Sequence, residues 1–162
     1  MTEMVQNFYI KKRIFRKVFE IYSSQDGKHL FMAYMHPLFI TKEIILKDLK
    51  DNDLISAKMT SWRKTAFDIF RNGKKIGSIS FPALPTFDCS YRRWYFELEL
   101  NGDNYTSSGA GIYSLKNSQD KSVLSIEPHF VKKIVEVDPS FDSTIALMTA
   151  LIFIVRIIQV SI

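Results

Sequence analysis

Short hydrophobic segments separated by turn residues recur between residues 8 and 137. The segments are rich in aromatic and β-branched residues, and polar or glycine-containing stretches separate them at fairly even spacing. Asp26-Gly27, Asn72-Gly73 and Asn101-Gly102 supply the backbone conformations that tight hairpins need. The pattern therefore predicts about ten or more short antiparallel strands.

The predicted strands follow one another closely along the chain. They cover residues 13–22, 28–35, 43–49, 54–60, 65–71, 75–81, 92–100, 105–106, 111–115, 122–126 and 130–137. In the seventh segment, Trp94, Phe96, Leu98 and Leu100 alternate with polar residues, which is typical of a strand with one buried face. So many strands usually close into a barrel or pack as two sheets.

The chain after residue 138 has a helical character. Asp138-Pro139 suits the start of a helix, and residues 140–160 contain neither proline nor glycine. Between residues 145 and 158 only Thr149 and Arg156 are polar, so the helix has no polar stripe and must be surrounded by protein or by lipid. Because Arg156 interrupts an already short apolar run, the pattern favours a buried core helix, and a membrane anchor is the alternative.

A barrel of ten or more strands has an interior too wide for its own side chains to fill. An apolar helix along its axis would fill that space. The helix residues expected in the core are Ile145, Leu147, Met148, Leu151, Ile152, Phe153 and Val155.

The order of several segments is similar to that of a known family. These segments are Phe19-Glu20-Ile21-Tyr22 with Asp26-Gly27-Lys28, the residues from Ala66 to Gly77, the residues from Tyr95 to Gly102, and the closing helix. With them, residues 8–160 resemble the tubby carboxy-terminal-like superfamily, which includes tubby proteins, phospholipid scramblases and plant LURP-one-related proteins. The resemblance implies a mainly β fold: a closed antiparallel β-barrel of about 10–12 strands around a central hydrophobic C-terminal α-helix. We expect residues 1–162 to form a single domain of this kind.

Charge adds a candidate site to this architecture. The chain has 22 Lys and Arg against 17 Asp and Glu, and a net charge of +5 favours acidic surfaces such as anionic lipid head groups. The densest basic cluster comprises Lys11, Lys12, Arg13, Arg16 and Lys17, interleaved with apolar residues. Near an anionic membrane each such charge contributes about 1 kcal/mol, so the cluster is a candidate lipid-binding site. The alternative is a solvated basic edge that prevents strand pairing with other molecules.

Other residue patterns indicate no reaction and no cofactor. His29, His36 and His129 lack the spacing of metal ligands, and Cys89 is the only cysteine, so neither a metal site nor an internal disulfide is expected. Residues 107–111 are glycine- and serine-rich but lack the lysine of a phosphate-binding loop, and they are expected to form a loop. Trp94 falls on the expected core face, which favours a role in the core over nucleic-acid binding by stacking.

These features together favour a non-enzymatic binding or scaffold domain. Its expected partners are anionic membrane lipids, phosphoinositides among them, or a partner protein. The N-terminal residues do not resemble a signal peptide, so the expected location is the cytoplasm, with peripheral association at the cytosolic membrane surface. Two alternatives remain open: a scramblase-like lipid transporter that uses the last helix, and a barrel that binds a small ligand in space beside the helix.

Overall fold

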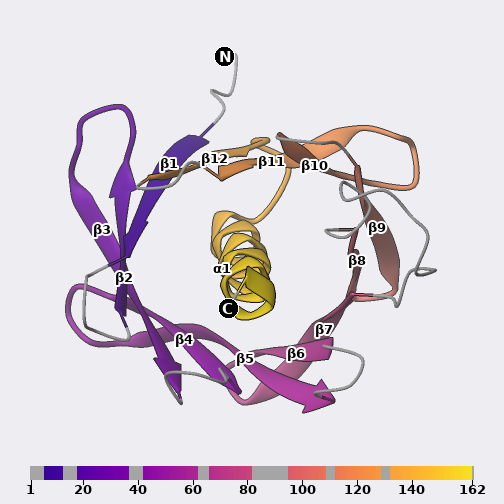
Figure 1. Cartoon of the computed structure of the whole chain (residues 1–162), viewed down its shortest axis with the longest axis horizontal. Helices are drawn as coiled ribbons and strands as arrows, with labels where there is room; N and C mark the ends of the chain where they lie inside the picture. The colour runs from indigo at the N-terminus through magenta and orange to yellow at the C-terminus, as the bar shows by residue number, and fades with distance from the viewer. Residues whose placement is uncertain are drawn as a thin grey trace.

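Twelve strands and one helix make up the described part of the chain (Figure 1). The computed structural model describes residues 6–12, 18–36, 42–61, 66–81, 95–108, 112–128 and 132–161. The strands are β1 (Gln6–Lys12), β2 (Val18–Ser23), β3 (His29–His36), β4 (Glu43–Asp48), β5 (Asp53–Ser61), β6 (Ala66–Arg71), β7 (Lys74–Ser80), β8 (Glu97–Leu100), β9 (Asp103–Ser108), β10 (Tyr113–Lys116), β11 (Ser122–Pro128) and β12 (Lys133–Val137). The helix is α1 (Ser143–Ser161).

The strands form one closed antiparallel barrel. Each strand pairs with its neighbours in sequence, and β1 closes the ring by pairing with β12, with Gln6 opposite Val137 and Ile10 opposite Lys133. Closure leaves no open sheet edge among the described strands. The prediction of a closed barrel of about 10–12 strands is confirmed, and packing as two separate sheets is wrong.

The tight turns are formed by the residues that the sequence singled out. At Asn72-Gly73 the φ angles are 53° and 75°, and at Asn101-Gly102 they are 50° and 89°. Positive φ at both central residues gives a turn whose twist matches that of the strands it joins. The hairpins β6–β7 and β8–β9 are therefore encoded locally.

The first strand was not anticipated. A first strand was predicted at residues 13–22, whereas the barrel begins with β1 at residues 6–12 and continues with β2 at residues 18–23; residues 13–17 lie outside the described residues. The partner that β1 needs on one side is β12, at the other end of the chain. A second difference concerns the loop expected at 107–111, because Ser107 and Ser108 belong to β9 and the buried Ser107 hydroxyl accepts a hydrogen bond from the Phe96 amide at 2.7 Å.

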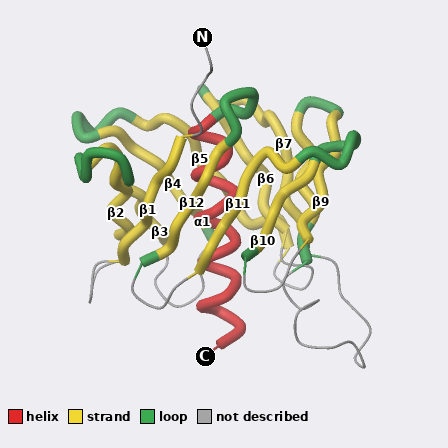
Figure 2. Tube along the Cα trace, turned by 90° about the horizontal axis from the view of Figure 1, so that it is seen from above, coloured by secondary structure: helices red, strands yellow, loops and turns green. Residues whose placement is uncertain are grey.

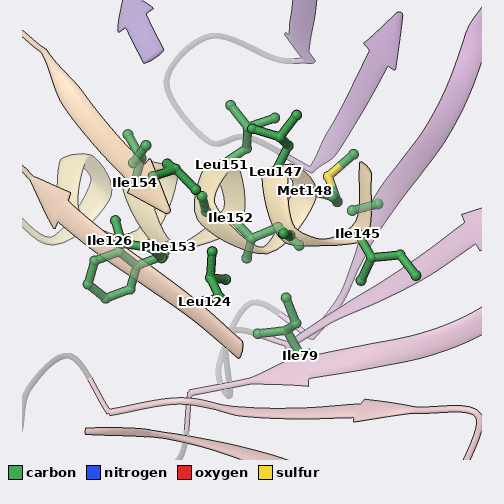
Figure 3. Close-up of a cluster of buried hydrophobic side chains, with 14 of the residues drawn as sticks. Ile79, Leu124, Ile126, Ile145, Leu147, Met148, Leu151, Ile152, Phe153 and Ile154 are labelled. Atoms are coloured by element: carbon green, nitrogen blue, oxygen red, sulfur yellow. The ribbon is translucent and has the colours of Figure 1, made fainter. Parts of the chain in front are cut away.

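The helix runs through the middle of the barrel (Figures 1 and 2). Every residue from 145 to 155 is buried, including all seven helix residues expected in the core and the polar Thr149, whose hydroxyl donates to the Ile145 carbonyl at 2.8 Å. The Phe153 ring lies 5.4 Å from that of Phe96 and 4.9 Å from that of Tyr113 (centroid distances). Figure 3 shows the helix side chains spreading toward the inward-facing residues of several strands, among them Ile79, Leu124 and Ile126. A helix without a polar stripe is thus surrounded by protein.

The helix begins a few residues later than predicted. The Asp138 side chain accepts a hydrogen bond from the Ser140 amide, and the Phe141 amide donates to the Asp138 carbonyl, so residues 138–141 form a turn. Asp142 caps the helix instead, since its carboxylate accepts from the amides of Thr144 and Ile145 at 2.9 and 3.2 Å. Asp138 was the wrong choice of cap because it serves the turn that leads from β12 into the barrel.

Within the described residues, no helix combines the length and the apolar character that crossing a membrane requires.

Candidate functional site

Pairing of β1 with β12 brings two pairs of lysines together. Lys11 and Lys12 end β1, while Lys132 and Lys133 stand at the start of β12. Because Ile10 lies opposite Lys133 in this antiparallel ladder, Lys11 comes opposite Lys132. Gln6 at the other end of β1 lies opposite Val137, which leads to the start of α1, so the lysines lie at the end of the barrel toward which the helix runs. We call these four residues the lysine cluster.

Aromatic rings adjoin the lysine cluster on the outer surface. Tyr9 lies directly opposite Tyr22, and their rings stack with centroids 5.0 Å apart and planes within 8°. His29 continues the stack, at 4.7 Å from Tyr22. The ammonium Nζ atoms of Lys132 and Lys11 lie 4.1 and 5.4 Å from the Tyr9 centroid, within the range of cation–π attraction. The Tyr9 ring therefore lies within cation–π distance of both lysines, and the Glu20 carboxylate opposite Lys11 accepts a hydrogen bond from the Tyr22 hydroxyl at 2.7 Å.

Three lysines of the cluster lack an ion-pair partner among the described carboxylates. Among the described residues, no carboxylate forms an ion pair with Lys11, Lys12 or Lys132. Burial lowers the pKa of Lys133, and the nearby charge of Lys12 lowers it further. Elsewhere on the barrel several lysines do pair with carboxylates, namely Lys47, Lys58, Lys75, Lys116 and Lys121. The cluster is thus a local concentration of positive charge suited to an anionic partner.

The structure brings together only part of the basic cluster that the sequence singled out. Lys11 and Lys12 are exposed on β1, whereas Arg13, Arg16 and Lys17 lie outside the described residues. Lys132 and Lys133 were missed. Their adjacency at the start of a predicted strand was the available signal, but it becomes meaningful only once β12 is known to pair with β1.

Other candidate chemistry is sparse in the described residues. No group of three or more His, Cys, Asp or Glu side chains that could hold a metal ion occurs among them. Trp62, Cys89, Trp94 and His129 lie outside the part that the structure describes. The outer surface has shallow concavities, of about 350 Å³ beside Lys58 and Phe70 and about 270 Å³ beside Glu97 and Glu99. The lysine cluster is the described feature whose chemistry indicates a partner most directly.

The fold and the site define a class of protein: a closed antiparallel barrel of 12 described strands that is filled by its C-terminal helix. Where β1 pairs with β12, which we call the seam, the barrel carries lysines beside stacked tyrosine rings. The chain is similar in structure to a protein from Arabidopsis thaliana solved by X-ray crystallography, with a TM-score of 0.65 and 16% sequence identity. The similarity covers 96% of this chain and 91% of the Arabidopsis chain, and at that identity it concerns the fold alone. No protein-family model and no curated protein sequence matches this chain.

Proposed function

We propose that this domain is a non-enzymatic binding module for anionic phospholipids at the cytosolic membrane surface. The observation that carries the proposal is the lysine cluster next to the Tyr9–Tyr22 stack, in which Lys11, Lys12 and Lys132 form no ion pair with a described carboxylate. Lysines near an anionic leaflet contribute about 1 kcal/mol each, and tyrosine is enriched at the membrane–water interface. Arg13, Arg16 and Lys17 follow Lys12 directly in the chain and add to the basic character of this region.

We further propose that the domain belongs to the tubby carboxy-terminal-like superfamily. The order of its segments supports this assignment, as does its barrel with a central C-terminal helix. Membership would make phosphoinositides the first lipids to test. The lysine cluster by itself supports anionic head groups in general, because ammonium groups act on phosphate as point charges.

Sedimentation with lipid vesicles tests the lipid proposal. Vesicles of phosphatidylcholine alone are compared with vesicles that also contain phosphatidylserine or a phosphoinositide, at low and at high salt. The domain is expected to sediment with the anionic vesicles at low salt and to be released as salt rises, since salt screens exposed charges. Absence of salt-sensitive binding to every anionic vesicle disproves the proposal.

A pair of matched variants assigns the binding to the lysine cluster. Lys11→Ala with Lys132→Ala removes about 2 kcal/mol of attraction and is expected to weaken vesicle binding roughly 30-fold. Lys50→Ala with Lys74→Ala removes the same charge from two exposed residues at the opposite end of the barrel, one in the β4–β5 turn and one at the start of β7, and is expected to change binding by only a few-fold. Equal losses in the two double variants would assign binding to net charge and not to the cluster.

A further inference from the structure

The outer surface of the barrel has two chemically different halves. Along β1 to β4 and β12 the buried residues alternate with outward-facing ones, so the outward residues follow directly from the burial pattern. The outward residues on these strands include a group of half-buried apolar and aromatic side chains, which we call the aromatic face: Tyr9, Tyr22, Met32, Tyr34, Ile45 and Ile134.

The strands on the other side of the ring present a different set of residues. Along β7 to β11 most outward positions hold serine, threonine, asparagine or glutamate, although Lys116 also faces outward. We call the following group the polar face: Ser78, Ser80, Glu97, Glu99, Asn104, Thr106 and Ser125. Ser78 lies opposite Glu99, which lies opposite Asn104 on the next strand, so the polar residues form continuous rows across the sheet. In a barrel that is exposed to water on all sides, outward-facing apolar residues are expected to be scattered among polar ones and not gathered on one side.

Lysines accompany the aromatic face along its length. Besides Lys11 and Lys132 beside Tyr9, Lys47 places its Nζ 5.6 Å from the Tyr34 centroid. Met32 lies opposite both Glu20 and Lys47, between the two aromatic groups. Tyrosine rings with lysine ammonium groups over them are a combination that favours a lipid head-group boundary, where the ring is partly buried and the charge stays at the phosphates.

Resting on the proposed function, we infer that the domain docks side-on, with the aromatic face against an anionic bilayer and the polar face toward water. The occupant is a lipid surface because the face joins Lys11 and Lys132, which form no ion pair with a described carboxylate, to apolar side chains, and that composition complements anionic head groups above acyl chains. Glu20, Glu43 and Glu136 face outward on the strands of the aromatic face, as Glu97 and Glu99 do on the polar face. The apolar side chains together with Lys11 and Lys132 therefore select the orientation, and the distribution of carboxylates does not.

Single-cysteine variants that carry an environment-sensitive fluorophore test this orientation. In a Cys89→Ser background, Met32→Cys places the fluorophore on the aromatic face, and Thr106→Cys places it on the polar face. With phosphatidylserine vesicles, emission from position 32 is expected to rise and shift to shorter wavelength, while emission from position 106 stays unchanged. The melting temperature of each labelled variant establishes that the barrel is folded.

The outcomes separate the orientation from the proposed function. If the protein sediments with the vesicles but the fluorophore at position 32 stays silent, or the one at position 106 responds equally, the orientation is wrong and lipid binding stands. If the protein does not sediment with anionic vesicles, both the proposed lipid binding and the docking orientation are wrong. A response at position 32 to another protein, without vesicles, would assign the aromatic face to a protein partner and overturn the inference.

A second variant tests the apolar contribution without a fluorophore. Tyr34→Ser leaves the lysine cluster intact and is expected to weaken vesicle binding about fivefold to tenfold, which corresponds to tens of Å² of apolar surface, with no change in the salt dependence. The control Ser80→Ala on the polar face is expected to bind like the wild type. An unchanged affinity of a folded Tyr34→Ser variant contradicts side-on docking.

Discussion

The Asp142 carboxylate links the start of the helix to the barrel wall. Asp142 accepts hydrogen bonds from the amides of Thr144 and Ile145, and Arg71 of β6 donates to it at 3.2 Å. The guanidinium of Arg71 also donates to the Thr144 hydroxyl. Although partial burial opposes ionisation of Asp142, the hydrogen bonds from Thr144 and Arg71 outweigh it and lower the pKa of this carboxyl below its ordinary value of 3.8.

This lowered pKa makes the contribution of Asp142 to stability dependent on pH. A carboxyl with a depressed pKa in the folded state stabilises the fold above its ordinary pKa, and the contribution is lost as pH falls through the folded value. Asp142→Asn is therefore expected to be less stable than the wild type at pH 7, and the difference should shrink below about pH 4. Urea unfolding at pH 7, 5 and 3 measures this difference.

A control separates the Asp142 effect from the loss of any surface carboxylate. Asp103→Asn removes an exposed carboxylate in the β8–β9 hairpin that is remote in sequence from the helix cap, and it is expected to change the unfolding free energy by less than about 0.5 kcal/mol. If the Asp142→Asn difference is the same at all three pH values, ionisation of Asp142 does not contribute.

At the scale of the element, α1 depends on the barrel as much as the barrel depends on α1. The helix has apolar residues all round, and Leu147, Leu151 and Phe153 are fully buried among the strands. In water such a helix would expose this surface, and an empty barrel would lose the contacts that fill it. Helix and barrel are therefore expected to unfold together.

Substitution of Leu151 tests this mutual dependence. Leu151→Ala is expected to lower the unfolding free energy by about 2–5 kcal/mol, because it leaves a cavity among buried neighbours. Leu49→Ala removes the same atoms from a residue that is 55% exposed and is expected to cost no more than about 0.5 kcal/mol. Denaturant unfolding followed by circular dichroism measures both.

Leu151→Asp distinguishes the core helix from a membrane anchor. An unpaired charge in the core is expected to prevent folding. A variant that stays folded and loses only membrane attachment would instead favour the scramblase-like alternative, in which the helix leaves the barrel.

At the scale of the whole molecule, closure depends on the two ends of the strand order. β1 pairs with β2, its neighbour in sequence, and with β12, which follows all the other strands in the chain. This pairing closes a loop that spans most of the chain, and contacts of that kind form late and slowly. The same seam assembles the lysine cluster, so the candidate site exists only in the closed barrel.

A disulfide across the seam tests closure directly. Asn7 lies opposite Glu136, so Asn7→Cys with Glu136→Cys in a Cys89→Ser background places two thiols on facing strands. The oxidised form is expected to be stabilised by up to about 4 kcal/mol relative to its reduced form, because the bond restricts a long loop in the unfolded chain. Thiol titration and thermal unfolding with and without reductant measure the effect. Failure of the disulfide to form in the native protein would contradict the β1–β12 pairing.

Most strands and the helix could be predicted from local sequence. Asn72-Gly73 and Asn101-Gly102 adopt the positive φ angles that two-residue hairpin turns require, so local sequence determines where these hairpins turn. Phe96, Leu98 and Leu100 alternate with polar residues, and this alternation predicts their buried face. β1 was not predicted because Lys11 and Lys12 weaken its alternating pattern and its second partner, β12, is distant in sequence. Lys132 and Lys133 were not predicted as part of the site because only the pairing of β12 with β1 brings them to Lys11 and Lys12.

The apolar closing segment required burial in any fold, since no solvent-exposed helix tolerates so few polar residues. Turn residues and the alternation of apolar and polar residues likewise determine where most strands begin and end, because both signals involve only residues a few positions apart. Pairing of β1 with β12 decided which lysines meet, and closure of the barrel decided how the outer surface divides into an aromatic and a polar face. Those features depend on contacts between residues far apart in the chain, whose free energy is gained only when the barrel closes.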